Sequence, residues 1–164
     1  MSARRVPLTG AEGVVGTVLR RGLEADIDLL PLTRRAEAFP SVVADIANLE
    51  AMTCACSGAD AVIHLAAAAW LDAPWDDVLE SNIVGTRNVF EAARLAGVRA
   101  VVFASSGHVV GAAENDDAGL YDLGDDRALD DSSSVRPDSL YAVSKVFGES
   151  LGRSYADTYG MRVI

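Results

Sequence analysis

The sequence predicts an α/β fold, in which a doubly wound parallel sheet carries helices on both faces. Short apolar segments alternate with longer segments of helical periodicity along the 164 residues, and a glycine-rich turn joins the first strand to the first helix. Such alternation implies parallel strands joined by right-handed crossovers. Half of the residues are hydrophobic, which is enough for one core, so we expect a single domain over 1–164.

The elements are predicted in order from apolar runs and from helical spacing. Strands are expected where a few apolar residues stand together, and helices where apolar residues recur every three or four positions. Pro7 is the exception in the first strand, because it has no N–H for a sheet hydrogen bond. We predict strands at 5–8, 28–32, 61–65 and 100–104, helices at 14–21, 46–55, 75–96 and 139–159, and the start of a fifth strand at 160–164.

The turn after the first strand contains Gly10, Gly13 and Gly16 at three-residue spacing. Glycine-rich turns between a strand and a helix bind pyrophosphate, because the missing Cβ atoms let the backbone approach the phosphates and the helix N-terminus supplies N–H donors. A tight turn without a ligand is the other interpretation of one such motif. Glu12 stands in this turn and counts against a nearby pyrophosphate.

In dinucleotide-binding α/β proteins, residues at the end of the second strand distinguish the ribose 2′-hydroxyl of NAD from the 2′-phosphate of NADP. An acidic residue at this place favours NAD, whereas this chain has Thr33, Arg34 and Arg35. A hydroxyl and a guanidinium suit a phosphate, so we expect NAD(P) with a preference for NADP. Arg34 and Arg35 as ordinary surface charges are the alternative.

The strand at 100–104 ends in Ser105 and Ser106. Ligands of open α/β sheets bind at the carboxyl ends of the strands, so Ser106 stands where a substrate oxygen could receive its hydrogen bond. A turn or a helix cap would use a serine pair in the same way.

Tyr141 and Lys145 stand four residues apart in the last predicted helix, and Lys145 is the only lysine of the chain. At this spacing both side chains lie on one helix face. A compact ammonium beside a phenol stabilises the phenolate, a task that the broader guanidinium of arginine does not easily take over. We therefore expect a chemical role for the pair, although the spacing also occurs by chance.

Taken together, these motifs resemble the extended short-chain dehydrogenase/reductase superfamily, also called the NAD-dependent epimerase/dehydratase family. The resemblance covers the whole chain and is closest to the uronate and sugar dehydrogenase branch. It implies a Rossmann-type fold and a sugar or uronic acid as substrate. The motifs that carry it are Thr9-Gly10-x-x-Gly13-x-x-Gly16, His64-Leu65-Ala66-Ala67, Asn82, Ser105-Ser106 and Tyr141-x-x-x-Lys145.

The resemblance also implies the roles of the site residues. Tyr141 would take the proton of the substrate hydroxyl, Lys145 would stabilise the phenolate and hold the nicotinamide ribose, and Ser106 would steady the oxygen that becomes a carbonyl. Asn82 either positions Lys145 through a water or is a buried structural amide. The cofactor residues implied are Gly10, Gly13, Val14, Val15, Gly16, Thr33, Arg34, Asp45, Ile46, Leu65, Ala66, Ala67, Asn82, Tyr141 and Lys145.

For the substrate, the resemblance implies Ser106, Gly107, His108 and Tyr141, with oxidation of an anomeric hydroxyl to a lactone. Gly107 and Ala69 stand where the uronate enzymes carry an amide and a hydroxyl, so a different sugar remains open. A nucleotide-sugar epimerase is the alternative enzyme, and a noncatalytic NAD(P)-binding sensor is the alternative of another class. A sugar dehydratase would need an Asp-Glu pair beside the serine, which this chain lacks.

Charge and cysteine content exclude other classes. A net charge of −10 argues against nucleic acid and anionic membranes as partners, and the scarcity of lysine resembles proteins from salt-loving organisms. Cys54 and Cys56 flank one residue, which suits neither zinc nor a dithiol redox motif, so we expect buried free thiols and no metal. The Asp-rich segment 114–134 is expected to be a solvated loop.

The ends of the chain give three further expectations. The start, at 1–5, has no apolar signal-peptide core, so we expect a cytoplasmic protein. Because members of the family continue well past the last residues, the chain is expected to be truncated, without most of the substrate-binding portion. The helices at 75–96 and 139–159 resemble those that pair in family homodimers, but their apolar faces could equally pack on the sheet.

Overall fold

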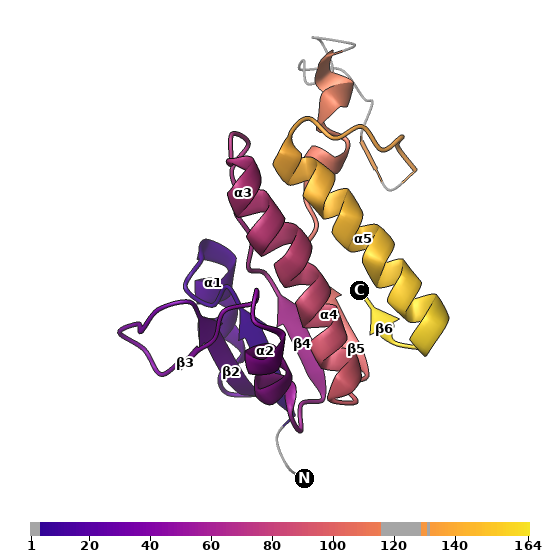
Figure 1. The fold of residues 1–164 in the computed structure, drawn as a ribbon. Helices are drawn as coiled ribbons and strands as arrows, with labels where there is room; N and C mark the ends of the chain where they lie inside the picture. The colour runs from indigo at the N-terminus through magenta and orange to yellow at the C-terminus, as the bar shows by residue number, and fades with distance from the viewer. Residues whose placement is uncertain (1–3, 116–128, 131) are drawn as a thin grey trace.

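The computed structural model describes residues 4–115, 129–130 and 132–164, and these form one six-stranded parallel sheet (Figure 1). The strand order is β3-β2-β1-β4-β5-β6. The direction of winding reverses between β1 and β4, and the crevice at such a switch point is where ligands bind. The strands are β1 Arg5–Thr9, β2 Asp28–Thr33, β3 Val42–Val43, β4 Ala61–His64, β5 Ala100–Phe103 and β6 Arg162–Val163.

The helices cover both faces of this sheet, as predicted. Right-handed crossovers place the helix between β1 and β2 on one face and the helices that follow β3, β4 and β5 on the other. The second set packs together in front of the sheet in Figure 1. The helical segments are α1 Val14–Leu23, α2 Leu49–Cys56, α3 Trp75–Asp77, η1 Val78–Gly85, α4 Thr86–Leu95, η2 Gly107–Val109, η3 Gly111–Asn115 and α5 Leu140–Tyr159.

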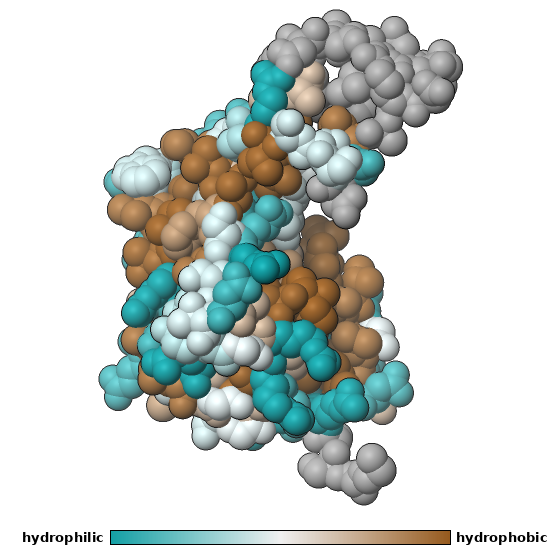
Figure 2. Space-filling view, turned by 90° about the vertical axis from the view of Figure 1, so that its right-hand side faces the viewer, coloured by the Kyte–Doolittle hydropathy of each residue, from teal (hydrophilic) through white to brown (hydrophobic). Residues whose placement is uncertain are grey.

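The hydrophobic core lies between the sheet and the helices α2, α4 and α5. Phe90 of α4 is fully buried at its centre, with its ring 6.2 Å from that of Phe103 and 5.4 Å from that of Tyr155. A Cβ at Gly148 would overlap the Phe103 ring, so this glycine lets α5 approach β5. The outer face that carries α5 intersperses apolar and polar side chains (Figure 2).

Two helices begin later than the sequence predicts, because polar residues cap them. The helix expected from Ile46 starts at Leu49, since the Asn48 side chain accepts a hydrogen bond from Ala51 N at 3.0 Å. Ser139 likewise caps α5 and accepts from Ala142 N at 3.1 Å. The strand β3 was not predicted, because two residues are too short for a period-two pattern.

The long helix predicted at 75–96 is present as three consecutive segments, α3, η1 and α4. In η1 the backbone adopts the wider π-helical turn, which leaves Asn82 and Gly85 buried. The place of a Cβ at Gly85 is filled by the side chain of Ile46, so this glycine lets the segment before α2 pack closely on the helix.

Pro7 is accommodated in the interior strand β1 by an irregularity of its neighbour β4. Arg5 O accepts from Asp60 N at 2.9 Å and Thr9 O accepts from Leu65 N at 3.3 Å. Four residue steps separate Arg5 from Thr9, but five separate Asp60 from Leu65, so β4 carries one extra residue opposite Pro7. A bulge is one of the places where a sheet tolerates a proline without its N–H.

Other sequence expectations meet the structure with different outcomes. Cys56 is buried, and burial raises the pKa of its thiol to about 11, but the expectation for Cys54 was wrong, because this residue is exposed on α2. Most of the Asp-rich segment lies outside the described residues. Within the part of the chain that the structure describes, no helix could cross a membrane and no cluster of three metal-binding side chains occurs.

Candidate active site

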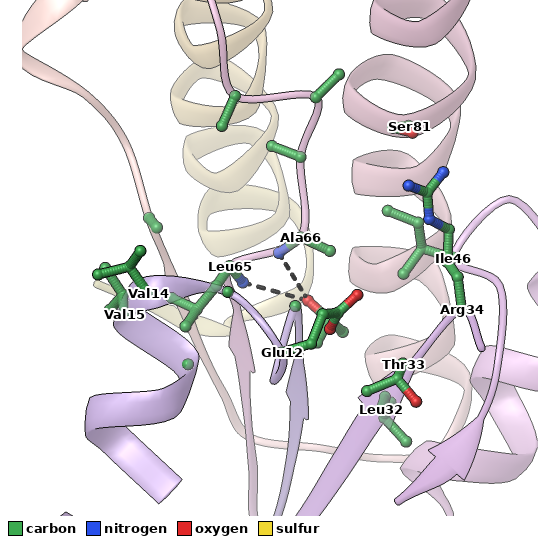
Figure 3. Close-up of a pocket in the computed structure, with 18 of the residues that line it drawn as sticks. Glu12, Val14, Val15, Leu32, Thr33, Arg34, Ile46, Leu65, Ala66 and Ser81 are labelled. Atoms are coloured by element: carbon green, nitrogen blue, oxygen red, sulfur yellow. Dashed lines mark hydrogen bonds between the residues drawn. The ribbon is translucent and has the colours of Figure 1, made fainter. Parts of the chain in front are cut away.

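A cleft of about 450 Å³ opens at the carboxyl ends of the central strands. Its wall is built from the glycine turn after β1, the end of β2, the segment after β4, the end of β5 and the first turns of α5. Figure 3 shows Val14 and Val15 on one side of the cleft, Thr33, Arg34 and Ile46 on the other, and Glu12 between them. The position agrees with the switch point of the sheet.

The glycine turn is shaped by two close approaches of backbone to backbone. Gly10 has a positive φ of 67°, and a Cβ there would lie 2.7 Å from Ala66 N. A Cβ at Gly16 would overlap Gly10 O. Gly13 caps α1 without a side-chain hydrogen bond, so the first N–H groups of this helix face the cleft without a side-chain partner.

A buried hydrogen-bond chain ties this turn to the segment after β4. Thr9 Oγ1 accepts from Leu65 N and Ala66 N, each at 3.2 Å (dashed in Figure 3), so its own proton goes to His64 Nδ1 at 2.8 Å. His64 Nε2–H then donates to Thr86 Oγ1 at 3.0 Å. Burial, with a smaller contribution from Lys145, lowers the pKa of His64 to about 3, so its imidazole stays neutral.

Lys145 reaches the cleft from α5 and is almost completely buried. Its Nζ donates to Ala104 O at 2.8 Å and lies 5.5 Å from the ring centroid of Tyr141. Burial lowers the pKa of Lys145 to about 8. Tyr141 and Lys145 line the same cleft, on one face of the helix, as their spacing predicts.

Asn82 is buried in η1 and is fully engaged by protein groups. Its Oδ1 accepts from Ala68 N at 2.7 Å, and its Nδ2 donates to Ala68 O at 3.2 Å and to Ser144 Oγ at 2.9 Å. These bonds join η1, the segment after β4 and α5 next to Lys145. Asn82 itself is not on the cleft wall.

The two serines after β5 are placed differently. Ser105 lines the cleft and its hydroxyl donates to the Glu149 carboxylate. Ser106 accepts from His108 N at 3.2 Å and so caps η2. Ser106, Gly107 and His108 lie beyond the cleft wall, although the His108 and Tyr141 rings are 6.3 Å apart, edge to face.

The residues at the end of β2 that were expected to recognise the ribose are also placed differently by the structure. Arg34 lines the cleft, whereas Arg35 does not. Thr33 is on the wall, but its hydroxyl already donates to Arg35 O at 2.7 Å. Ile46 lines the cleft, while Asp45 is turned to the backbone and accepts from Ala47 N at 2.9 Å.

Most of the other expected cofactor residues share this cleft, and further residues join them. The expected residues on the wall include Gly10, Gly13, Val14, Val15, Gly16, Leu65, Ala66 and Ala67. Sequence reasoning missed several wall residues, among them Leu32, Ala44, Ala68, Trp70, Asp77, Ser81 and Ala104. Their signal was positional: most of them directly follow, or lie close to, a predicted strand end or a recognised motif.

The cleft fits a dinucleotide on the grounds of its own geometry. Gly10, Gly13 and Gly16 put no Cβ on the cleft wall, and the N–H groups at the start of α1 can receive a phosphate there. The Glu12 carboxylate of the same turn also lines the cleft and opposes this binding by its charge. Tyr141 and Lys145 stand on the same wall as this turn. The arrangement can therefore hold a pyrophosphate at one end and a ribose near an ammonium at the other.

Comparison with known proteins gives relatives over nearly the whole chain. The model of the family described as "NAD dependent epimerase/dehydratase family" matches residues 6–164. An L-arabinose 1-dehydrogenase (NAD(P)(+)) of Haloferax volcanii is 45% identical over 163 residues, which are 98% of this chain and 64% of that protein. A uronate dehydrogenase of Pseudomonas syringae pv. tomato is 35% identical, over 98% of this chain and 57% of its own length.

Solved structures give the same picture. The uronate dehydrogenase from Agrobacterium tumefaciens has a TM-score of 0.80 and 32% identity, covering 99% of this chain and 59% of that one. The glucuronic acid dehydrogenase from Chromohalobacter salexigens has a TM-score of 0.81 and 32% identity, again over 99% and 59%. The chain thus spans about 57 to 64% of the lengths of the two curated relatives described above.

Proposed function

The chain belongs to the NAD-dependent epimerase/dehydratase family, and from this premise we propose that its protein is an NAD(P)-dependent sugar dehydrogenase. The reaction proposed is the oxidation of a hydroxyl group of an aldose or a uronic acid. The relatives named as arabinose and uronate dehydrogenases support this substrate class.

One observation carries the proposal: Tyr141 and Lys145 line the same cleft as the glycine turn. A phenol and an ammonium on one helix face can act on a single bound alcohol, and the turn supplies the anchor for a pyrophosphate. A binding protein without catalysis would need the glycine turn but not the pair of Tyr141 and Lys145.

In the proposed mechanism the residues of the chain bind, orient and move a proton. A bound NAD(P) would supply the hydride acceptor for this oxidation. Tyr141 takes the hydroxyl proton, and the Lys145 ammonium, held on Ala104 O at 2.8 Å, favours the phenolate that does so. The Ser106 hydroxyl would donate to the oxygen as it becomes a carbonyl. Asn82 fixes the place of Ser144, next to Lys145 on α5.

The preference for NADP is part of the proposal and rests on Arg34. This guanidinium lies on the cleft wall at the end of β2, where a ribose 2′-phosphate would be read. The Thr33 hydroxyl adds less than the sequence suggests, because it donates to Arg35 O. Glu12 lines the same cleft and works against a second phosphate through its negative charge.

A homodimer is also part of the proposal. Exposed apolar side chains stand on the outer surfaces of η1 and α5, two segments that pack against each other. Burying these side chains between two copies would supply apolar contact area. They are Leu79 and Val84 on η1, and Leu140 and Val143 on α5. Sedimentation of the purified protein over a range of concentrations tests the assembly, and a monomer at all of them contradicts it.

The test of the function is a screen of the protein with free aldoses and uronates in the presence of NAD or NADP. Growth of the absorbance of reduced nicotinamide on a free sugar is expected. The Tyr141→Phe variant should abolish turnover and leave cofactor binding intact, because only the hydroxyl is removed. Tyr159→Phe is the matched control, since this tyrosine is exposed at the far end of α5.

Two other outcomes would replace the proposal. Interconversion of a nucleotide sugar without net formation of reduced cofactor would identify an epimerase. Tight binding of the dinucleotide with no turnover of any sugar, unchanged by Tyr141→Phe, would identify a noncatalytic sensor.

A further inference from the structure

A second ionisable pair lies beside Tyr141, formed by His108 and Asp138. His108 Nδ1 is 2.6 Å from Asp138 Oδ2, and the two side chains retain 44% and 22% of their exposure. His108 belongs to η2, which follows β5, and Asp138 stands just before α5. The pair therefore joins the two segments that carry Ser106 and Tyr141.

The carboxylate of Asp138 is itself held in place. Ser139 Oγ donates to Asp138 Oδ1 at 2.9 Å, and a Cβ at Gly111 would overlap Oδ2, so the glycine leaves room for the carboxylate. Partial burial opposes its ionisation, but the hydrogen bonds from His108 and Ser139 outweigh this and lower the pKa of Asp138. Asp138 is thus an ionised acceptor.

An ionised carboxylate can only accept hydrogen bonds, so the proton of a neutral His108 must be on Nδ1. The other ring nitrogen, Nε2, is then left as an acceptor. Within residues 4–115, 129–130 and 132–164 no hydrogen bond to Nε2 is described. The main chain of His108 is also held, because His108 N donates to Ser106 Oγ at 3.2 Å.

We propose that Asp138 is a positioning residue for substrate: it holds His108 in the Nδ1–H tautomer, so that Nε2 accepts a hydrogen bond from a sugar hydroxyl. The proposal rests on the proposed function, and it adds the chemistry of the contact. The His108 and Tyr141 rings approach edge to face, with their centroids 6.3 Å apart, so the histidine lies next to the tyrosine that would take the proton. The hydroxyl that it receives would be one close to the reacting carbon.

The tautomer can be measured by NMR without any catalysis. The signals are easy to assign, because the chain contains only two histidines. Nitrogen-15 NMR of histidine side chains, at a pH well above the ordinary pKa of imidazole, is expected to show His108 protonated on Nδ1 and His64 protonated on Nε2. The His64 assignment follows from Thr9 and Thr86, and it serves as an internal reference. His108→Gln identifies the His108 signals by removing them.

Three variants separate the carboxylate from the fold. Asp138→Leu removes the acceptor and should release His108 to a mixture of tautomers. Gly111→Ala should do the same, because the new methyl group displaces the carboxylate without changing it. Asp138→Asn keeps an acceptor oxygen, so His108 should stay in the Nδ1–H form in this variant. The His64 signals should stay in place in all three, which shows that the fold is retained.

Kinetics then test the contact with substrate. Loss of one hydrogen bond from the sugar corresponds to about a 3- to 10-fold rise in its KM. Asp138→Leu and Gly111→Ala should show this rise with the KM for cofactor unchanged, and Asp138→Asn should come close to the wild type. A wild-type His108 protonated on Nε2, or a tautomer indifferent to Asp138→Leu, overturns the positioning role.

The kinetic measurements decide whether His108 contacts the substrate. If the tautomers change as expected but the sugar KM does not, the contact with substrate is overturned. Failure of the protein to oxidise any sugar would instead remove the proposed function, and it would do so with the NMR result for Asp138 and His108 still standing.

Discussion

Lys145 Nζ donates a hydrogen bond to Ala104 O at 2.8 Å, which ties α5 to the carboxyl end of β5. The ammonium thereby sits between the strand end that leads to the serines and the helix face that carries Tyr141. Because the side chain is only 4% exposed, burial works against its charge. Lys145, the sole lysine of the chain, should therefore lose its proton at a lower pH than an exposed lysine does.

We expect Lys145 to titrate near pH 8. Burial lowers its pKa from 10.5 to about 8, so the folded protein releases this proton before the unfolded chain does. The free energy of unfolding should then rise between about pH 8 and pH 10.5, by up to about 3 kcal/mol. NMR of labelled lysine follows a single side chain, and Lys145→Met should remove the rise. A midpoint near pH 10.5 would contradict the burial.

His64 should make the protein sensitive to mild acid. Burial lowers its pKa to about 3 in the folded protein. Between about pH 6.5 and pH 3 the unfolded chain therefore binds a proton at His64 that the folded chain does not bind. Stability should fall as the pH drops from about 6.5 towards 3, with about 2 kcal/mol lost between pH 7 and pH 5. Urea unfolding at both pH values measures this loss. It should disappear in His64→Gln and persist in His108→Gln.

The glycine turn should tolerate no side chain at its two close approaches. Gly10→Ala combines a positive φ with a contact of 2.7 Å to Ala66 N, and Gly16→Ala would overlap Gly10 O. Each should cost about 1–3 kcal/mol of stability and weaken dinucleotide binding. Gly22→Ala is the control, because nothing lies within 4 Å of its Cβ in α1, and it should stabilise the helix by up to about 1 kcal/mol. Thermal melting and cofactor titration compare the three, and equal effects would argue against the close approaches.

The two arginines after β2 should differ in their effect on cofactor choice. Arg34→Gln should weaken binding of 2′,5′-ADP about tenfold and leave 5′-ADP almost unchanged, because Arg34 lines the cleft. Arg35→Gln removes the same charge from a residue off the wall and should change neither. Calorimetry with both nucleotides measures the difference. Equal losses in the two variants would reduce Arg34 to a general surface charge, and tighter binding of 5′-ADP by the unaltered protein would overturn the NADP preference.

Much of the fold could be predicted because its signals are local. The strand at Ala61–His64 and the helix beginning after Ser139 are visible as an apolar run and as a capped periodic segment. The shared wall of Gly13 and Lys145 was expected from the resemblance to the family, which implies that both residues hold one cofactor.

The remainder depends on contacts between segments far apart in the chain. No local pattern tells that Asn82 will bond Ser144, 62 residues away, or that Ser105 rather than Ser106 will line the cleft. The partnership of His108 with Asp138 spans 30 residues and includes the room left by Gly111. Such pairings are decided by packing, which the sequence alone does not encode in any short window.

The extra residue of β4 opposite Pro7 sets which face of the sheet each later side chain of that strand occupies. If an N–H stood at position 7, a regular ladder could run on from Asp60 and would pair Thr9 O with His64 N in place of Leu65 N. A slip of one residue inverts the faces of a strand, and the imidazole of His64 would then leave both of its threonine partners. The missing N–H of Pro7 thus accompanies the strand register that keeps the His64 imidazole between Thr9 and Thr86.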